Sequence, residues 1–453
     1  MPLFSKRIRD PLHGLIPFNS ELDKVCWDII QTAPFQRLRR VKQLGFSEFT
    51  YPGASHSRLA HSIGVFHTAR RLADRLHEII PSVRHDNESK CAAISAALVH
   101  DLGHGPFSHA FEEALESSGF HWSHEDMSES LIRDTEVGDI LDRLMPNHRE
   151  KVIDIVGTQN PKNLYYSIVS SQFDADRLDY MQRDRLMSGR LGSAIDFPWL
   201  LANLDLQRVP VYQDEELQGE IETFVIGSKS ILAAEAYVLG LFQLYQTVYL
   251  HKTTRGLEKI FSEILKRLFL LRNGGSIDKT GLDANHAIFQ FLEDSGNPEK
   301  FLKLDDTLIW GALHQLRDAK DAVLSDLAVR LLERKIYKAI DLTALVQSKV
   351  EPDKVRSTEV EVVSKISDKF SSVVNQSPRV LHDVAKRNPY KRLSASGDSL
   401  KKILAMDRDG NLRDLTDLSS VVSALKPFHS RRVYCKDESE KKSVIEFIMG
   451  ELK

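Results

Sequence analysis

The chain has 453 residues, of which 42% are hydrophobic and 28% charged, and its formal net charge is −3. This composition is typical of an ordered globular protein with a large core, and it excludes a disordered or fibrous chain. We see no run of about eighteen uncharged apolar residues and no apolar segment behind the basic residues of Met1 to Arg9, so we expect neither a membrane span nor a secretion signal. The balanced charge gives no overall attraction to nucleic acid. Three scattered cysteines, Cys26, Cys91 and Cys435, favour a reducing cytoplasm over a disulfide framework.

The first 53 residues predict an irregular N-terminal segment and then a helix. Turn signals stand at Asp10-Pro11 and His13-Gly14, and apolar residues recur at helical spacing from Glu21 to about Lys42. The end of this helix, Arg37 to Lys42, is strongly basic, which leaves open a solvated face or an anion-binding role. Residues 45–53 are rich in Phe and Tyr and predict a short strand or turn.

An amphipathic helix is predicted from about Arg58 to Ile80. Arg58 and His61 are three residues apart and therefore share a helix face. A single His on such a helix is usually a hydrogen-bonded core or surface residue. His61 gains a functional interpretation only if a partner site exists elsewhere in the chain.

The segment Val99 to His109 supplies that partner site, because it holds three His and one Asp within eleven residues. It follows an apolar run that predicts a buried helix, and Gly103 and Gly105-Pro106 predict where this helix ends. His100 and Asp101 are then on its last turn, where the partial negative charge of a helix C-terminus suits a cation. Further His-Asp pairs at His85 and His382 lack this context.

Two later segments carry further polar candidates. Ser123 is a predicted helix cap, and His124 beside it is either a local packing residue or a catalytic one. Asp176, Tyr180 and Asp184 repeat every four residues and form one stripe on a helix. The residues alone leave open a salt-bridged surface or the binding of a metal and a phosphorylated sugar.

The rest of the chain predicts a mixture of helices and short strands. We expect two strands joined by a polar turn at 207–226, a long helix at 229–272 and two or three further helices at 284–335. A second hairpin is expected at 403–415, a strand at 432–436 and a closing helix at 438–452.

His61, His100, Asp101 and Asp176 together offer two imidazoles and two carboxylates from three predicted helices. A donor set of nitrogen and oxygen without sulfur favours a divalent metal such as Mn, Fe, Mg, Ni, Co or Zn. The sequence therefore predicts a divalent metal site.

The spacing of this set resembles that of the His-Asp superfamily of metal-dependent phosphohydrolases. The likeness extends to the branch of deoxynucleoside triphosphate (dNTP) triphosphohydrolases through seven motifs in order, at residues 10–14, 35–39, 42–45, 52–56, 61–65, 100–109 and 176–180. It implies a mainly α fold with a His-Asp helical core, small β-hairpin elements and an α+β C-terminal region, without a sterile-alpha-motif module. We expect a core at 1–205, a helical extension that completes the active site at 206–345, and a regulatory or oligomerisation region at 346–453.

The resemblance also implies roles for individual residues. His61, His100, Asp101 and Asp176 would hold the metal, Arg58 and Arg177 would contact phosphate, and His124 would be the general acid for the leaving 5′ oxygen, with His104 and His109 on the same reacting side. Gln43 and Leu44 would border the sugar, where Leu44 leaves a ribose 2′-OH unpaired. Tyr180 and Asp184 would border phosphate and sugar, and Tyr249 the sugar or base.

The expected function is thus hydrolysis of a dNTP to the deoxynucleoside and inorganic triphosphate, by a cytoplasmic, allosteric homo-oligomer (dimer or tetramer). Three positions depart from the family pattern: Arg177 replaces a Lys, Leu241 replaces an Arg, and Gln31 replaces an Asp of an activator site. Lys6, Arg7, Arg37 and Arg39 are candidates to bind a nucleotide effector. The alternatives are a phosphohydrolase acting on another nucleotide phosphoester, or a nucleotide or nucleic-acid sensor with little turnover, for which the basic segments at 37–42 and 386–402 leave room.

Overall fold

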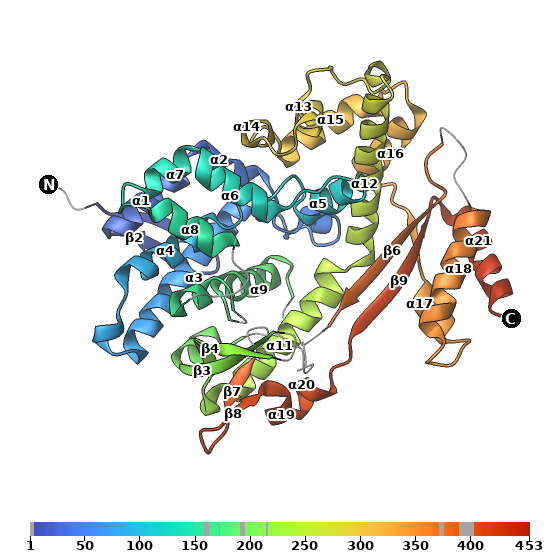
Figure 1. Ribbon diagram of the computed structural model, residues 1–453. Helices are drawn as coiled ribbons and strands as arrows, with labels where there is room; N and C mark the ends of the chain where they lie inside the picture. The colour runs from blue at the N-terminus through green and yellow to red at the C-terminus, as the bar shows by residue number, and fades with distance from the viewer. Residues whose placement is uncertain are drawn as a thin grey trace.

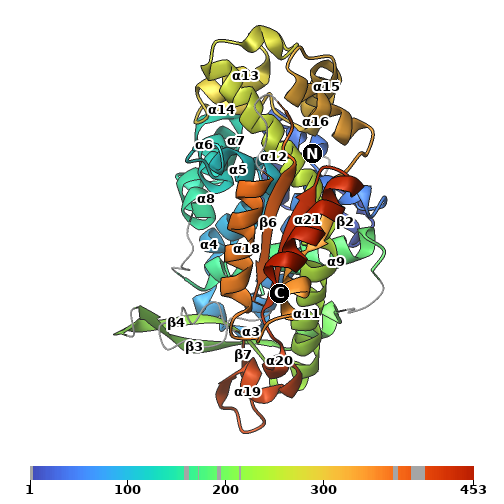
Figure 2. The same ribbon diagram turned by 90° about the vertical axis from the view of Figure 1, so that its right-hand side faces the viewer.

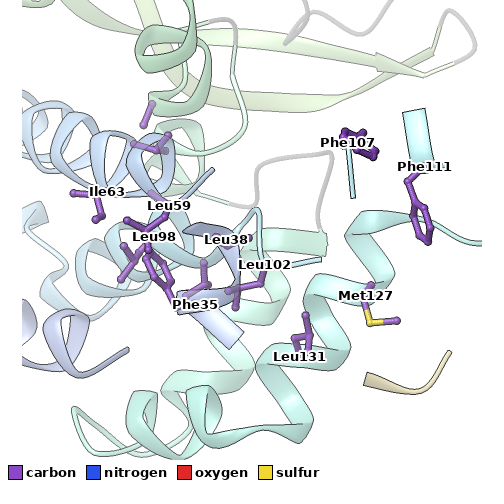
Figure 3. Packing of buried hydrophobic residues seen from close by; sticks show 14 of the residues in the cluster. Phe35, Leu38, Leu59, Ile63, Leu98, Leu102, Phe107, Phe111, Met127 and Leu131 are labelled. Atoms are coloured by element: carbon purple, nitrogen blue, oxygen red, sulfur yellow. The ribbon is translucent and has the colours of Figure 1, made fainter. Parts of the chain in front are cut away.

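Three helices form the centre of the computed structural model, which describes residues 4–157, 163–171, 173–190, 195–213, 216–370, 376–388 and 403–453. Helix α3 (Arg58–Ile79) packs against both α4 (Asn87–Val99) and α9 (Ala175–Met187). Figure 3 shows the core between them, where Leu59 and Ile63 of α3 face Leu98 of α4. Small residues of α4 are almost wholly buried, which lets α3 approach closely.

Shorter elements surround this centre (Figure 1). They are β1 (Lys6–Asp10), β2 (Gly14–Phe18), α1 (Glu21–Ile30), α2 (Ala33–Arg37), α5 (His109–Glu116), α6 (His124–Asp134), α7 (Glu136–Leu141), α8 (His148–Gly157) and α10 (Phe197–Ala202). The antiparallel pair β1–β2 stands where the sequence predicts an irregular segment, so that expectation is wrong. The predicted helix from Glu21 to Lys42 is interrupted at Thr32, which caps α2. Of the expected strand or turn, residues 45–49 form the turn, of 3₁₀ type.

The long helix expected at 229–272 is divided in two. Helix α11 (Ile231–Leu244) runs into a π-helical turn (Tyr245–Tyr249), and α12 (Lys252–Asn273) begins after His251, whose side chain caps it. The segment Ser228–Tyr249 is long and apolar enough to cross a membrane, with a mean hydropathy of 1.2, and 39% of it is buried within the protein. Its buried residues belong to the main core, and Tyr245 and Tyr249 line a pocket described below.

The elements after α12 form a group of helices at one end of that helix and a sheet beside it (Figures 1 and 2). Four helices, and not the expected two or three, fill residues 287–332: α13 (Ala287–Glu293), α14 (Pro298–Phe301), α15 (Asp306–Arg317) and α16 (Ala322–Leu332). A three-stranded antiparallel sheet of order β5–β9–β6 follows, from β5 (Lys338–Asp341), β6 (Val380–Arg387) and β9 (Phe428–Cys435). It packs with α17 (Leu342–Gln347), α18 (Val355–Lys369) and the predicted closing helix α21 (Glu438–Glu451) around a small second core.

Both predicted hairpins are present, and they share one sheet. Strands β3 (Leu204–Gln213) and β4 (Glu216–Ile226) pair antiparallel. Ile226 of β4 pairs in parallel with Ala405 of β7 (Leu404–Met406), and β7 pairs antiparallel with β8 (Leu412–Asp414). Two short helices, α19 (Leu415–Leu418) and α20 (Ser420–Ala424), follow β8. The fold is therefore mainly α with small β elements, as expected. Most of the basic segment 386–402 lies outside the described residues.

Candidate active site

Four side chains from the three central helices converge at one point. His61 lies one turn into α3, His100 caps the C-terminus of α4, and Asp176 is in the first turn of α9, with Asp101 next to His100. His61 Nε2 is 3.0 Å from Asp176 Oδ1, and His100 Nε2 is 3.3 Å from Asp101 Oδ1 and 3.6 Å from Asp176 Oδ1. The set predicted from the sequence is thus brought together, with spacings near the ~3 Å between neighbouring ligands of an ion bound at about 2.1 Å.

The hydrogen bonds of the two imidazoles suit a metal. His61 Nδ1 is 2.9 Å from Asp179 Oδ2, and His100 Nδ1 is 2.9 Å from the carbonyl oxygen of Ala97. Both acceptors require the proton on Nδ1, which leaves a lone pair on Nε2. Both Nε2 atoms are buried, and among the described residues neither has a hydrogen-bond partner of good geometry, although Asp176 Oδ1 lies 3.0 Å from His61 Nε2. Two orphaned nitrogens that face two carboxylates fit a divalent cation.

The electrostatics of this position also favour a cation. Burial lowers the pKa of His61, but the carboxylates of Asp176, Asp179 and Asp101 around the ring outweigh burial and raise the pKa to about 10, so this position attracts positive charge, which a metal ion would supply in place of the Nε2 proton. Burial raises the pKa of Asp101, yet the Arg58 guanidinium and the imidazoles of His100 and His104 hold it well below its usual range. The carboxylates are therefore ionised at neutral pH and available as ligands.

Arg58 connects this position to the loop that follows α4. Its Nη1 donates to Asp101 Oδ2 at 2.6 Å, and its Nε donates to Ser108 Oγ at 2.7 Å. Phe107 and Ser108 have positive φ angles, a strained conformation for residues other than glycine. The loop is held in this shape because Phe107 N donates to Asp306 and Ser108 Oγ donates to the Lys42 carbonyl.

Three histidines form a second cluster beside the first. The rings of His104 and His124 are stacked, with centroids 3.9 Å apart and an interplanar angle of 19°, and His109 meets both edge-on. Their nitrogens are close enough to bind an ion, but two stacked rings cannot both direct an in-plane lone pair at it. The cluster is therefore better suited to proton transfer.

Glu112 orients this cluster. Its carboxylate is 3.0 Å from His124 Nδ1 and 3.5 Å from His109 Nδ1. Burial raises its pKa, but hydrogen bonds from His109 and His124 dominate and hold it well below the usual range. An ionised acceptor on Nδ1 leaves His124 Nε2 to handle a substrate proton.

A pocket of about 280 Å³ adjoins the first cluster. It is lined by Gln43, Leu44, Arg58, Ser108, His109, Tyr180, Asp184, Tyr245, Tyr249, Thr254, Arg255 and Glu258, among others. Asp184 accepts hydrogen bonds from the Tyr249 hydroxyl at 2.7 Å and from His56 at 2.8 Å. Gln43 Oε1 is buried and has no hydrogen-bond partner among the residues that the structure describes, so it is available to a ligand.

Two predicted residues lie differently from expectation. Arg177 donates to the Ser171 carbonyl at 2.7 Å and pairs with Asp174, and it does not line the pocket. Arg37, a candidate effector residue, is 1% exposed and donates to the carbonyls of Leu304, Leu102 and His104. Its buried position excludes a surface role in effector binding.

Sequence reasoning missed several residues that complete the site. Glu112 lies three residues after His109, so helical spacing alone could have suggested it. Asp179 lies in the same segment as Asp176 and Tyr180, but its partner His13 is distant in the chain. Arg255 and Glu258 of α12 belong to no recognisable sequence motif, so no signal in the sequence marks them.

Comparison with known proteins agrees with this geometry. The HD domain family model matches residues 58–183. The uncharacterized protein YwfO of Bacillus subtilis (strain 168) is 31% identical over 425 residues, covering 93% of this chain and 89% of that protein. The deoxynucleoside triphosphate triphosphohydrolase SAMHD1 homolog of Dictyostelium discoideum is also 31% identical over 370 residues, but this chain spans only 62% of its length.

A solved structure shares the whole architecture. The crystal structure of a phosphohydrolase from Bacteroides thetaiotaomicron VPI-5482 superposes with a TM-score of 0.73 at 27% identity, covering 95% of this chain and 100% of that one. The fold, the convergence of the His and Asp residues and the similarity to these relatives all indicate one family. The chain therefore belongs to the HD-domain family of phosphohydrolases.

Proposed function

We propose that the protein is a metal-dependent dNTP triphosphohydrolase that releases the deoxynucleoside and inorganic triphosphate. The observation that carries this proposal is the pocket beside the His and Asp cluster. It is lined both by Arg58, which is bonded to Asp101, and by the aromatic and apolar side chains of Leu44, Tyr180 and Tyr249. The Arg58 guanidinium, which suits a phosphate, and the apolar side chains, which suit a nucleoside, thus line one cavity next to the predicted metal ligands.

In the proposed reaction, water attacks the α-phosphorus and the bond from this phosphorus to the 5′ oxygen breaks. His61, His100, Asp101 and Asp176 would hold a divalent cation, which supplies Lewis-acid polarisation of the phosphate and a more acidic water. Arg58 would bind the charge that develops on the α-phosphate.

The leaving 5′ oxygen needs a proton, and His124 is the proposed donor. Glu112 accepts from His124 Nδ1 and so leaves Nε2 as the nitrogen that would donate the proton. His104, which burial keeps neutral by lowering its pKa well below 6.5, supports the ring of His124 by stacking.

Selection of the deoxy sugar would depend on Gln43 and Leu44. Gln43 offers an unpaired acceptor to a sugar hydroxyl, whereas Leu44 offers none, so a ribose 2′-OH would be left without a partner. The similarity of this chain to deoxynucleoside triphosphate triphosphohydrolases of Dictyostelium discoideum and Mus musculus supports the same substrate class.

Arg177 would contact phosphate only after releasing Asp174. Leu241, which replaces an Arg of the resembled family, favours the second candidate function, hydrolysis of another nucleotide phosphoester. We also propose a homo-oligomer regulated by a nucleotide, for which Lys6, Arg7 and Arg39 remain exposed candidates.

The test is a product analysis. The purified protein is incubated with Mn²⁺ and each dNTP and NTP, singly and in mixtures that could supply an activator, and the products are separated by ion exchange. We expect deoxynucleoside and triphosphate, and loss of both in His100→Ala and Asp101→Ala. His85→Ala, from a His-Asp pair outside the site, is the matched control and should keep its activity. Release of phosphate or diphosphate alone would favour the second candidate, and no release from any nucleotide would overturn the proposal.

A further inference from the structure

Asp179 is the centre of a buried hydrogen-bond network directly behind the predicted metal ligands. Its Oδ2 accepts from His61 Nδ1 at 2.9 Å and from Arg183 Nε at 2.8 Å. Its Oδ1 accepts from His13 Nε2 at 2.6 Å and from Arg183 Nη2 at 3.0 Å. The side chain of Asp179 is 0% exposed, so all its interactions are with the protein.

The network extends to the N-terminal hairpin. Asp10 Oδ2 accepts from Arg183 Nη1 at 2.9 Å, and Asp10 Oδ1 accepts from the backbone N–H groups of Leu12 and His13. The turn between β1 and β2 is thereby fixed, and it presents His13 to Asp179. A hairpin that begins the chain thus reaches the back of the site across 166 positions of sequence.

The network is packed tightly against Gly64 of α3. A Cβ atom added at Gly64 of α3 would lie 2.1 Å from Asp179 Oδ1 and 2.3 Å from Arg183 Nη2. Only glycine allows α3 and α9 to approach closely enough for Asp179 to reach His61. Two carboxylates around one guanidinium also leave a surplus negative charge, which makes the His61 imidazole a stronger electron donor.

We propose that Asp179 is a positioning residue that fixes the tautomer and orientation of His61 for metal binding, and that His13 extends this support to the N-terminal hairpin. Asp179 itself does not touch the metal. It acts by holding the Nδ1 proton, so that Nε2 faces Asp176 and Asp101. The inference rests on the metal site of the proposed function, but it does not depend on which nucleotide is hydrolysed.

The test measures Mn²⁺ affinity of the full-length protein without nucleotide, from the electron paramagnetic resonance signal of free Mn²⁺. We expect Asp179→Asn to weaken binding about 10- to 100-fold and His13→Ala to weaken it by a smaller factor. His13→Gln keeps a donor at this position and should restore most of the affinity. Circular dichroism and thermal melting establish that each variant is folded.

His429→Ala is the matched control, because it removes another buried His–carboxylate pair, with Glu359 at 2.8 Å, far from the site. It should lose stability but bind Mn²⁺ as the wild type does. Wild-type affinity in folded Asp179→Asn, equal weakening in His429→Ala, or no difference between His13→Gln and His13→Ala would overturn the proposal. If Asp179→Asn fails to fold, the comparison of Mn²⁺ affinity between His13→Gln and His13→Ala tests the proposal instead. Normal Mn²⁺ binding with no nucleotide hydrolysis would overturn the proposed function and leave this inference standing.

Discussion

The two imidazoles that face the predicted metal position are each fixed by their second nitrogen. Asp179 holds His61, and the carbonyl of Ala97 holds His100. Arg58 likewise fixes Asp101. Because the ligands are oriented by the protein, little conformational entropy is lost when a cation binds.

At the scale of residues, the sequence predicted ligands better than their supports. His61, His100, Asp101 and Asp176 follow a recognisable spacing, and the structure brings them together. Asp179 lies only three residues after Asp176, but it faces the buried side of α9, and His13 is too distant for any spacing rule. Supports of this kind depend on tertiary contacts that a local pattern cannot contain.

The raised pKa of Glu258 predicts that substrate binding depends on pH. It lines the pocket, and burial, together with the charges of Glu113 and Asp383, raises its pKa to about 7 although Arg255 and Lys259 oppose this. As pH rises through 7 the carboxyl loses its proton, which adds a negative charge to the pocket that would bind a polyanionic nucleotide in the proposed function. We expect KM for the nucleotide to rise about fivefold between pH 6 and 8, an effect of ~1 kcal/mol.

Initial-rate kinetics across this pH range checks the prediction. Glu258→Gln is neutral throughout and should show a flat KM profile near the wild-type value at pH 6. A wild-type KM that falls or stays constant as pH rises would contradict the assigned sign.

At the scale of elements, periodicity and capping residues predicted helices well. α3, α4, α9 and the Ser123 cap of α6 all stand where expected. The break between α11 and α12 was missed because no Gly or Pro marks it. A π-helical turn absorbs the change of direction there and places Tyr245 and Tyr249 in the pocket.

The buried guanidinium of Arg37 holds several elements around the site together, so its substitution should destabilise the fold. Its guanidinium joins α2 to the loop after α4 and to the segment before α15, and it lies 4.2 Å from the ring of Phe301. Arg37→Met would leave three buried carbonyls without donors, so we expect a loss of about 3 kcal/mol in the free energy of unfolding. Urea denaturation measures this loss.

Arg39→Met is its matched control, because Arg39 is exposed and, within the described part of the chain, its side chain donates only to Gln36. It should change the free energy of unfolding by less than about 0.5 kcal/mol. Equal stability of the two variants would show that the buried hydrogen bonds of Arg37 contribute nothing.

At the scale of the whole molecule, the sequence predicted an α+β C-terminal region but not where it packs. Its sheet lies against α12, where Arg255 pairs with Asp383 at 2.6 Å and Tyr434 donates to the Lys252 carbonyl. Because α12 also supplies Thr254, Arg255 and Glu258 to the pocket, this region supports one wall of the site. Because these contacts join residues more than a hundred positions apart, no local sequence pattern predicts them.

Metal removal tests the site through the stability of the whole protein. A cation bound by His61, His100, Asp101 and Asp176 would tie α3, α4 and α9 together and offset the repulsion between the two carboxylates. At 100 times its dissociation constant it should stabilise the folded state by about 2.7 kcal/mol, which corresponds to a rise in Tm of roughly 3–5 °C. Protein stripped with a chelator is melted by differential scanning calorimetry with increasing Mn²⁺. His85→Ala should show the full rise and His100→Ala almost none, and the same rise in His100→Ala would mean that Mn²⁺ stabilises the protein elsewhere.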